Sequence, residues 1–152
     1  MNGGKYEGEW KEDKQHGHGK EIWNNGAETY EGDFVEGKKN GRGRFSWSDG
    51  SYYEGDFVEG LFEGVGLYYF KESEKTYNGQ FHDGKIEGEG EMKWGDGREY
   101  YGQFRDGKED GEGTFKYATG HLYIGKFKEG KMNGFAIYID TDVSTKRHGE
   151  WK

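Results

Sequence analysis

Apolar and polar side chains alternate over short stretches of the chain, with aromatic rings and glycines sharing one parity. In the segment Tyr30–Phe34, the rings of Tyr30 and Phe34 flank Gly32, while Glu31 and Asp33 take the positions between them. Side chains two apart lie on the same face of a β-strand, so this pattern predicts a strand with its rings on one side. The segment 41–47 alternates in the same way and predicts a second strand.

The same pattern returns at a fixed period. Aligned tyrosines are 23 or 24 residues apart, at Tyr6, Tyr30, Tyr53, Tyr77, Tyr100 and Tyr123, with Arg147 at the next equivalent position. Self-similarity at such a period indicates a repeat array. We therefore expect residues 1–152 to form one array of six repeats and a partial seventh.

Glycine-containing turn signals separate the repeats. Asn25-Gly26, Asp49-Gly50 and Asp96-Gly97 are dipeptides that favour hairpin turns in which both central residues have positive φ. Strand glycines facing large rings let those rings lie flat on the neighbouring backbone. The predicted fold is all-β, an elongated single-layer antiparallel meander of tandem β-hairpins with about 13 strands.

The motif Tyr-x-Gly-x-Phe-x-x-Gly-x-x-x-Gly-x-Gly resembles the membrane occupation and recognition nexus repeat, MORN. It departs from that pattern near the ends, at Asp13 and Glu21 in repeat one and at Ala136, Asp140 and Val143 in repeat six. Terminal repeats of an array are often atypical because they cap it. The resemblance implies a scaffold protein without catalytic activity.

Two settings follow from this resemblance. The closing segment His148-Gly149-Glu150-Trp151 resembles family members in the radial spoke heads of motile cilia. That likeness implies a cytoplasmic structural protein of the cilium or flagellum, in the axoneme or cytoskeleton. The alternative is a phosphoinositide-binding, membrane-apposed or regulatory module that belongs to a larger protein, such as a lipid kinase or a methyltransferase.

The amino-acid composition narrows the classes of partner that the chain is expected to bind. The 5 Trp, 12 Tyr and 10 Phe argue against disorder, although the net charge is −8. An acidic chain without a dominant basic cluster is not expected to bind nucleic acid, and anionic membranes also become a poor fit. The longest apolar runs are far shorter than the roughly 18 residues of a membrane span, and the chain has no cysteine.

Catalytic chemistry has no visible basis in the sequence, so we expect no enzyme activity, cofactor or metal. His16 and His18 lack a third metal ligand at a suitable spacing. A basic cluster, comprising Lys38, Lys39, Arg42 and Arg44, has the composition of a phosphoinositide site. We expect instead a solvated loop balanced by Glu31, Asp33 and Glu36.

Two repeats carry apolar residues where the others are polar. Repeats two, four and five have Arg, Ser, Glu, Thr or Lys on the face away from the rings, and repeats three and six do not. Such a patch on a charged surface predicts a protein contact, with self-association through the C-terminal repeat as one form of it. A sheet that curls to bury these residues is the alternative. In repeat three we expect Leu61 and Phe62 to lie in the turn before the strand. The predicted protein-binding residues are Phe62, Val65, Leu67, Tyr69, Ile124, Phe135, Ile137 and Ile139.

Overall fold

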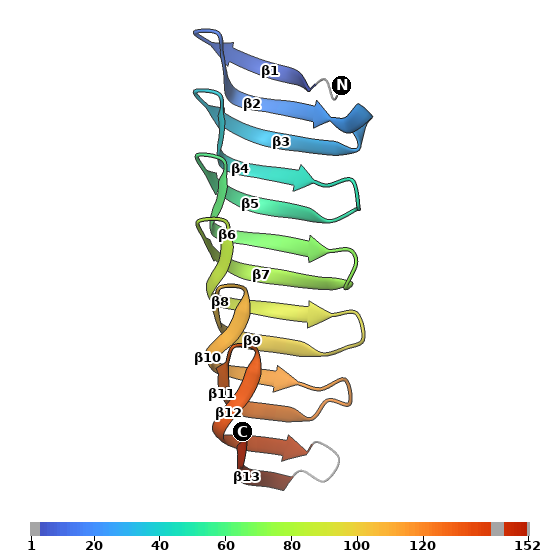
Figure 1. Cartoon of the computed structure of the whole chain (residues 1–152), viewed down its shortest axis with the longest axis vertical. Coiled ribbons are helices and arrows are strands. Elements are labelled where there is room, and N and C mark those ends of the chain that lie inside the picture. The colour runs from blue at the N-terminus through green and yellow to red at the C-terminus, as the bar shows by residue number, and fades with distance from the viewer. Residues whose placement is uncertain (1–3, 141–144, 152) are drawn as a thin grey trace. The chain divides into compact units, whose positions relative to one another are not determined.

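The computed structural model describes residues 4–140 together with the backbone of residues 145–151. The chain divides into two units, Met1–Glu72 with Phe81–Gly84, and Ser73–Gln80 with Lys85–Lys152. Strands β1 to β13 follow one another in the sheet in the order of the sequence, and the strand pairs described within each unit are antiparallel, as the ribbon in Figure 1 shows. The predicted all-β meander is confirmed.

Unit 1 contains β1 (Lys5–Lys11), β2 (Lys14–Trp23), β3 (Glu28–Val35), β4 (Lys38–Ser46), β5 (Tyr52–Val58) and β6 (Leu61–Phe70). Unit 2 contains β8 (Lys85–Trp94), β9 (Glu99–Arg105), β10 (Lys108–Lys116), β11 (Leu122–Lys128), β12 (Lys131–Asp140) and β13 (Thr145–Trp151). Strand β7 (Lys75–His82) contributes residues to both units.

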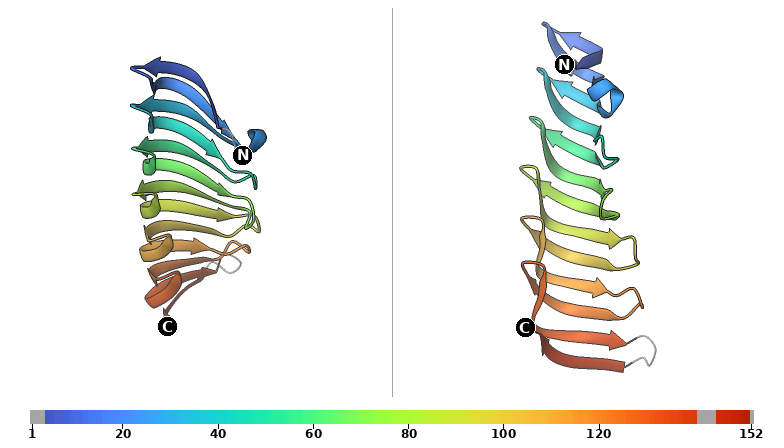
Figure 2. Two further views of the ribbon diagram at one scale, coloured as in Figure 1. Left: turned by 45° about the horizontal axis from the view of Figure 1, so that its top comes forward. Right: turned by 45° about the vertical axis from the view of Figure 1, so that its right-hand side comes forward.

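Repeats one, two, three, five and six each form one hairpin whose second strand carries a bulge. In repeat two, Gly32 pairs with Gly43 and Phe34 pairs with Lys39, so three residues of β4 lie opposite Asp33 alone. Gly41, inside that bulge, has φ of 102°, a conformation that other residues adopt only with strain. The bulge increases the local bend, and the turn ends of the hairpins curl, as Figure 2 shows.

The motif tyrosines define the inner face of the sheet, and the opposite side is its outer face. In the first five repeats the motif ring lies flat on a glycine of the neighbouring strand, and Ala136 takes the place of that glycine in the sixth. A Cβ at Gly43 would be 2.5 Å from two ring carbons of Tyr30. The Tyr30 hydroxyl donates a 2.9 Å hydrogen bond to the carbonyl of Asp33, where the strand pairing is interrupted. The predicted packing of rings over glycines is thus confirmed.

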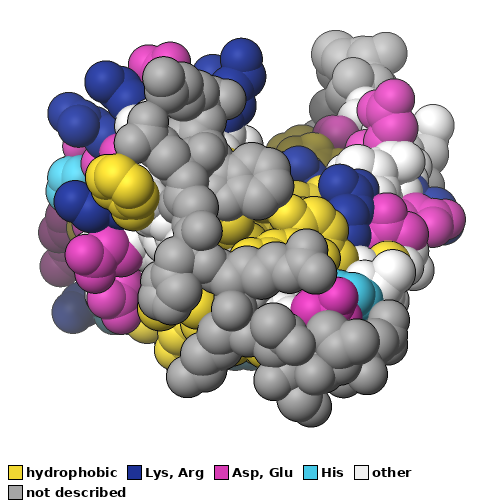
Figure 3. Space-filling view, turned by 90° about the horizontal axis from the view of Figure 1, so that it is seen from below, with side chains coloured by type: hydrophobic (Ala, Val, Ile, Leu, Met, Phe, Trp, Pro, Cys, Tyr) yellow, Lys and Arg dark blue, Asp and Glu magenta, His cyan; other side chains and the backbone are white. Residues whose placement is uncertain are grey.

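Phenylalanines link the motif tyrosines of the first five repeats to the repeat that follows. The Tyr30 ring meets Phe34 of its own repeat and Phe57 of the following one edge-on, both at 5.1 Å. Unit 2 repeats this with Tyr100 between Phe104 at 5.0 Å and Phe127 at 4.9 Å. These rings are almost fully buried although the sheet is a single layer, because they cover one another. Figure 3, which views the molecule from below, shows hydrophobic side chains near the centre of the view and again at its left edge, with charged side chains along the borders.

The turns differ from the sequence prediction. Within hairpins, a residue and a glycine with positive φ form the turn, as in Glu36-Gly37, and the first repeat uses Glu12-Asp13. Between repeats, Gly50 and Gly97 have positive φ and the aspartates before them do not, so a turn of two positive-φ residues was wrong there. The Gly50 N–H donates to the Trp47 carbonyl, and the Trp47 N–H donates to the Ser51 carbonyl. Three residues therefore lie between Trp47 and Ser51, one more than in a two-residue hairpin loop.

Candidate functional site

The outer face of unit 2 carries a row of side chains that crosses four strands. Tyr101 on β9 pairs with Thr114 on β10, Thr114 pairs with Ile124 on β11, and Ile124 pairs with Ile137 on β12. Residues directly opposite each other in an antiparallel pair have neighbouring side chains. The row is therefore continuous across the four strands, and it is apolar apart from the hydroxyl groups of Tyr101 and Thr114.

Phe135 extends this row along β12. Its side chain is 77% exposed, Tyr101 is 66% exposed and Ile124 is 37% exposed. These residues line a shallow surface hollow together with Glu112 and Lys126, which pair across β10 and β11. We call Tyr101, Ile124, Phe135 and Ile137 the outer patch.

Tyr101 and Thr114 are members of this surface that sequence reasoning missed. The signal was present in the parity of Tyr101, which follows the inward Tyr100 and therefore points outward. Ile139, predicted to belong to the surface, pairs with Leu122 at the far end of β12 and is only partly exposed.

The residues predicted from repeat three do not form an equivalent surface. Val65 is 53% exposed on the outer face, whereas Leu67 and Tyr69 are partly covered. Leu67 pairs with Glu54, and the ring of Tyr69 packs 5.5 Å from that of Tyr52. This part of the outer face is therefore more polar and better covered than the outer patch.

Phe62 does not lie in the turn, where the sequence analysis placed it. It belongs to β6 and stacks on the motif ring Tyr53 with centroids 3.9 Å apart and an interplanar angle of 14°. Its parity matches that of Gly66 and Tyr68, so its side chain points to the inner face. Phe62 is separated from Val65 by the thickness of the sheet.

The two arginines of the basic cluster in repeat two pair with carboxylates of the following strand. Arg42 forms a 3.0 Å ion pair with Asp56, and Arg44 forms a 3.1 Å pair with Glu54. Lys39 points inward and pairs with Glu21 at 3.5 Å. The expected balance of charge is present, but its main partners differ from those expected, because strand register places β5 beside β4.

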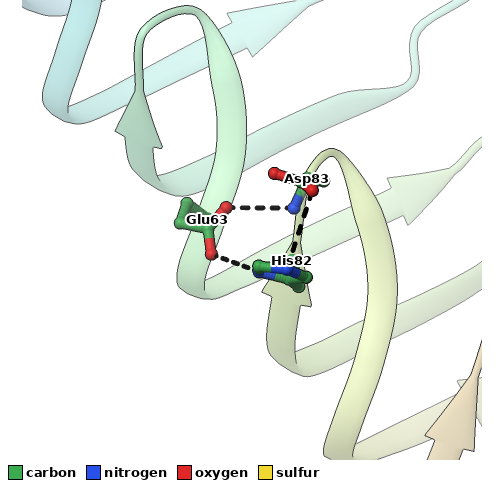
Figure 4. A group of neighbouring side chains, drawn as sticks. All are labelled: Glu63, His82 and Asp83. Atoms are coloured by element: carbon green, nitrogen blue, oxygen red, sulfur yellow. Dashed lines mark hydrogen bonds and ion pairs between the residues drawn. The ribbon is translucent and has the colours of Figure 1, made fainter.

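Histidines meet carboxylates at the surface. His18 lies 3.8 Å from Glu31 and 3.7 Å from Asp33. Among the described residues, one group has the spacing of a metal site: Glu63, His82 and Asp83, drawn in Figure 4.

The geometry of that group has a structural explanation. The Glu63 carboxylate accepts hydrogen bonds from the Asp83 N–H at 3.0 Å and from the His82 ring at 2.7 Å, and both bonds lower the pKa of Glu63. Unit 2 repeats the first of these contacts, since Glu87 accepts from the Asp106 N–H at 2.9 Å. Glu63 thus holds the positive-φ residue of the next turn.

These features define a class, the tandem β-hairpin repeat proteins. The inner face supplies a fixed ladder of rings, and the outer face varies from repeat to repeat. No helix in the described part of the chain is both long enough and apolar enough to cross a membrane.

The chain belongs to the MORN repeat family. The MORN repeat matches residues 6–28, 30–52, 53–73, 77–97, 100–122 and 123–142, so all six expected repeats are found. The family's all-β repeats are typically non-catalytic modules of protein or membrane interaction. Among curated proteins, none matches this chain.

Proposed function

We propose that the protein is a non-enzymatic scaffold that binds another protein through the outer patch. The observation that carries this proposal is the apolar row of Tyr101, Ile124 and Ile137, extended by the exposed Phe135. Fully burying an exposed apolar side chain of this size contributes roughly 1.5 to 3 kcal/mol before the costs of association, so the highly exposed Phe135 and Tyr101 contribute most. Four such side chains together are enough for a specific contact.

The composition of the patch favours a protein over a lipid surface. Glu112 and Lys126 flank the apolar row, so the surroundings contain both signs of charge. An anionic membrane recruits clustered basic side chains, and the arginines of repeat two are already paired with Asp56 and Glu54. The membrane-apposed alternative predicts tight binding to phosphoinositide vesicles in a flotation assay, whereas the scaffold proposal predicts weak, salt-sensitive binding.

A charge placed in the patch tests the proposal. Ile137→Lys and Phe135→Lys should leave the circular dichroism spectrum and melting curve nearly unchanged and abolish partner retention in affinity purification. Val65→Lys, an equally outward change in unit 1, is the matched control. Retention of the same partner by all three variants would rule out this surface.

Self-association is tested with the same variants in a separate measurement. Sedimentation velocity of the purified chain separates a homodimer from a monomer that awaits another partner. If the wild type sediments as a dimer and Ile137→Lys as a monomer, the partner is a second copy. Unfolding of Ile137→Lys would instead make Ile137 a core residue.

The axoneme of cilia or flagella is the setting that we propose for the scaffold, because segment 148–151 resembles spoke-head members of the family. The backbone of this segment lies in β13 and pairs with β12, and its side chains lie outside the described residues. A tagged copy expressed in ciliated cells should co-localise with axonemal tubulin. A tag that fills the cell body and leaves the cilium unlabelled contradicts this setting.

A further inference from the structure

One inner-face position holds a different residue in every repeat. The ninth residue after each motif tyrosine, here called the covering position, is Gln15, Lys39, Phe62, Ile86, Glu109 and Met132 in turn. Phe62 and Lys39 lie over the motif ring of their own repeat, at 3.9 Å and 5.3 Å from the ring centroids. The motif fixes the layer beneath this position and leaves the residue itself free to vary.

The surroundings of Lys39 show which kind of group this layer of the inner face can hold. Its ammonium lies 5.2 Å from the Trp23 ring centroid and 5.7 Å from that of Phe45, and 3.5 Å from the Glu21 carboxylate. Both charged side chains of that pair are about one-fifth exposed. Rings that surround a partly buried cation stabilise it through their negative faces, and the carboxylate adds a charged partner. In unit 1 the chain itself thus supplies the cation.

Unit 2 has the three rings in the equivalent positions, whereas Met92 stands where unit 1 has Glu21. Trp94, Tyr100 and Phe115 correspond to Trp23, Tyr30 and Phe45, and the Trp94 and Phe115 rings are 6.1 Å apart, against 5.8 Å for Trp23 and Phe45. The covering position, however, holds Glu109. Burial, followed by the neighbouring Glu109 carboxylate, raises the pKa of Tyr100, so this carboxylate acts on that ring.

Glu109 has no ion-pair partner within 4.0 Å among the described residues. Burial raises the pKa of its carboxyl, and Lys75 is a more distant cation that acts in the opposite direction. Its neighbours in the covering line of unit 2 are Ile86, which is buried, and Met132. An acidic group is therefore held between two apolar ones on a face built of rings.

We propose that Glu109 binds a lysine or arginine side chain of a partner polypeptide, with apolar side chains of that partner over Ile86 and Met132. Equivalent residues of successive repeats are two strands apart, about 9.6 Å. A polyproline II segment advances about 9.3 Å in three residues and returns its side chains to the same face. The partner segment thus carries an apolar residue, then a basic residue three positions later, and a second apolar residue three positions after that. This surface is separate from the outer patch.

The probe is a synthetic acetylated and amidated peptide with leucine, lysine and leucine at that spacing and proline or alanine between them. Its control replaces lysine by norleucine, which keeps the aliphatic stem and removes the charge. Binding is followed through the intrinsic tryptophan fluorescence and by calorimetry. The lysine peptide should bind, and the norleucine peptide should bind about tenfold more weakly, the effect of one charged hydrogen bond.

Two variants on β10 distinguish specific binding of the lysine at Glu109 from non-specific electrostatic attraction to an acidic protein. Glu109→Gln should weaken the lysine peptide about tenfold, whereas Glu112→Gln, which removes the same charge from the outer face, should not. Equal loss in both variants, equal binding of the two peptides, or no binding to the wild type would each overturn the proposal. None of these results bears on the outer patch, which is tested by Phe135→Lys.

Discussion

The outer faces of the two units carry different chemistry on the same framework. In unit 1, one cross-strand row reads Glu31, Arg44, Glu54 and Leu67, and in unit 2 the row at the same repeat positions reads Tyr101, Thr114, Ile124 and Ile137. The inner rings beneath both rows pack edge-on at nearly equal distances. The ring ladder therefore determines the fold, and the outer row is free to specify contacts.

Alkaline pH should have the largest effect, because it acts on the ladder of both units together. Burial raises the pKa of Tyr30, Tyr53, Tyr77 and Tyr100 above the ordinary value of 10.0. As the pH rises, these phenols ionise in the unfolded chain before they ionise in the folded protein. Their contribution to the free energy of unfolding is therefore fully present below pH 10 and is lost as the pH rises further. Urea midpoints measured from about pH 9 to about pH 11 should decrease steeply above pH 10. A flat profile would show that the phenols are not buried.

Gly43→Val should cause the next largest loss. The added side chain would occupy the space of the Tyr30 ring, whereas Ser46→Val on the outer face of the same strand adds its methyl groups outside the ring ladder. Overpacking typically costs about 1 to 3 kcal/mol, and the rigid backbone pair Gly32 and Gly43 places this site at the upper end. Equal melting temperatures for the two variants would contradict the packing of rings over glycines.

Tyr30→Phe should have a smaller effect, since the ring remains and only the hydroxyl is lost. The hydrogen bond to the Asp33 carbonyl contributes about 1 kcal/mol, and its loss leaves that carbonyl at the bulge without this donor. Tyr101→Phe is the exposed control and should unfold like the wild type. Chemical denaturation resolves the difference, and a neutral Tyr30→Phe would leave the preference for tyrosine over phenylalanine unexplained.

The outer row should contribute least to folding. A triple variant, Tyr101→Glu, Thr114→Arg and Ile124→Glu, copies the row of unit 1 onto unit 2. Exposed ion pairs contribute between about zero and 1 kcal/mol, so the free energy of unfolding should change little while partner binding is lost. Unfolding of this variant would mean that the outer patch belongs to the core of unit 2.

The period-two pattern was enough to predict the hairpins and the shared face of Tyr30, Phe34, Phe45 and Trp47. It could not reveal the bulge at Gly41, because alternation carries no information about φ. It also could not pair Arg42 with Asp56, since that contact depends on the register between strands of successive repeats.

The prediction of the docking residues was incomplete because the sequence alone does not show which strand positions lie side by side. Phe62 was assigned to a turn although its parity with Tyr68 places it inside. Tyr101 was overlooked because it stands in a repeat whose second strand is polar, and only the pairing of β9, β10 and β11 brings it beside Ile124. Whether these residues bind a partner stays a prediction.

The hydrogen bonds of the turn glycines also determine how such chains can gain or lose whole repeats. The Gly60 N–H donates to the Lys39 carbonyl of the preceding repeat, and the Gly130 N–H donates to the Glu109 carbonyl in the same way. Each bond reaches only the adjacent repeat, as do the contacts between phenylalanine and tyrosine rings. A segment from one motif tyrosine to the next can therefore be duplicated or deleted in a gene without a mismatch in the interior. Evolution can lengthen the reach of the protein by copying, and it can then alter the copied surface one residue at a time.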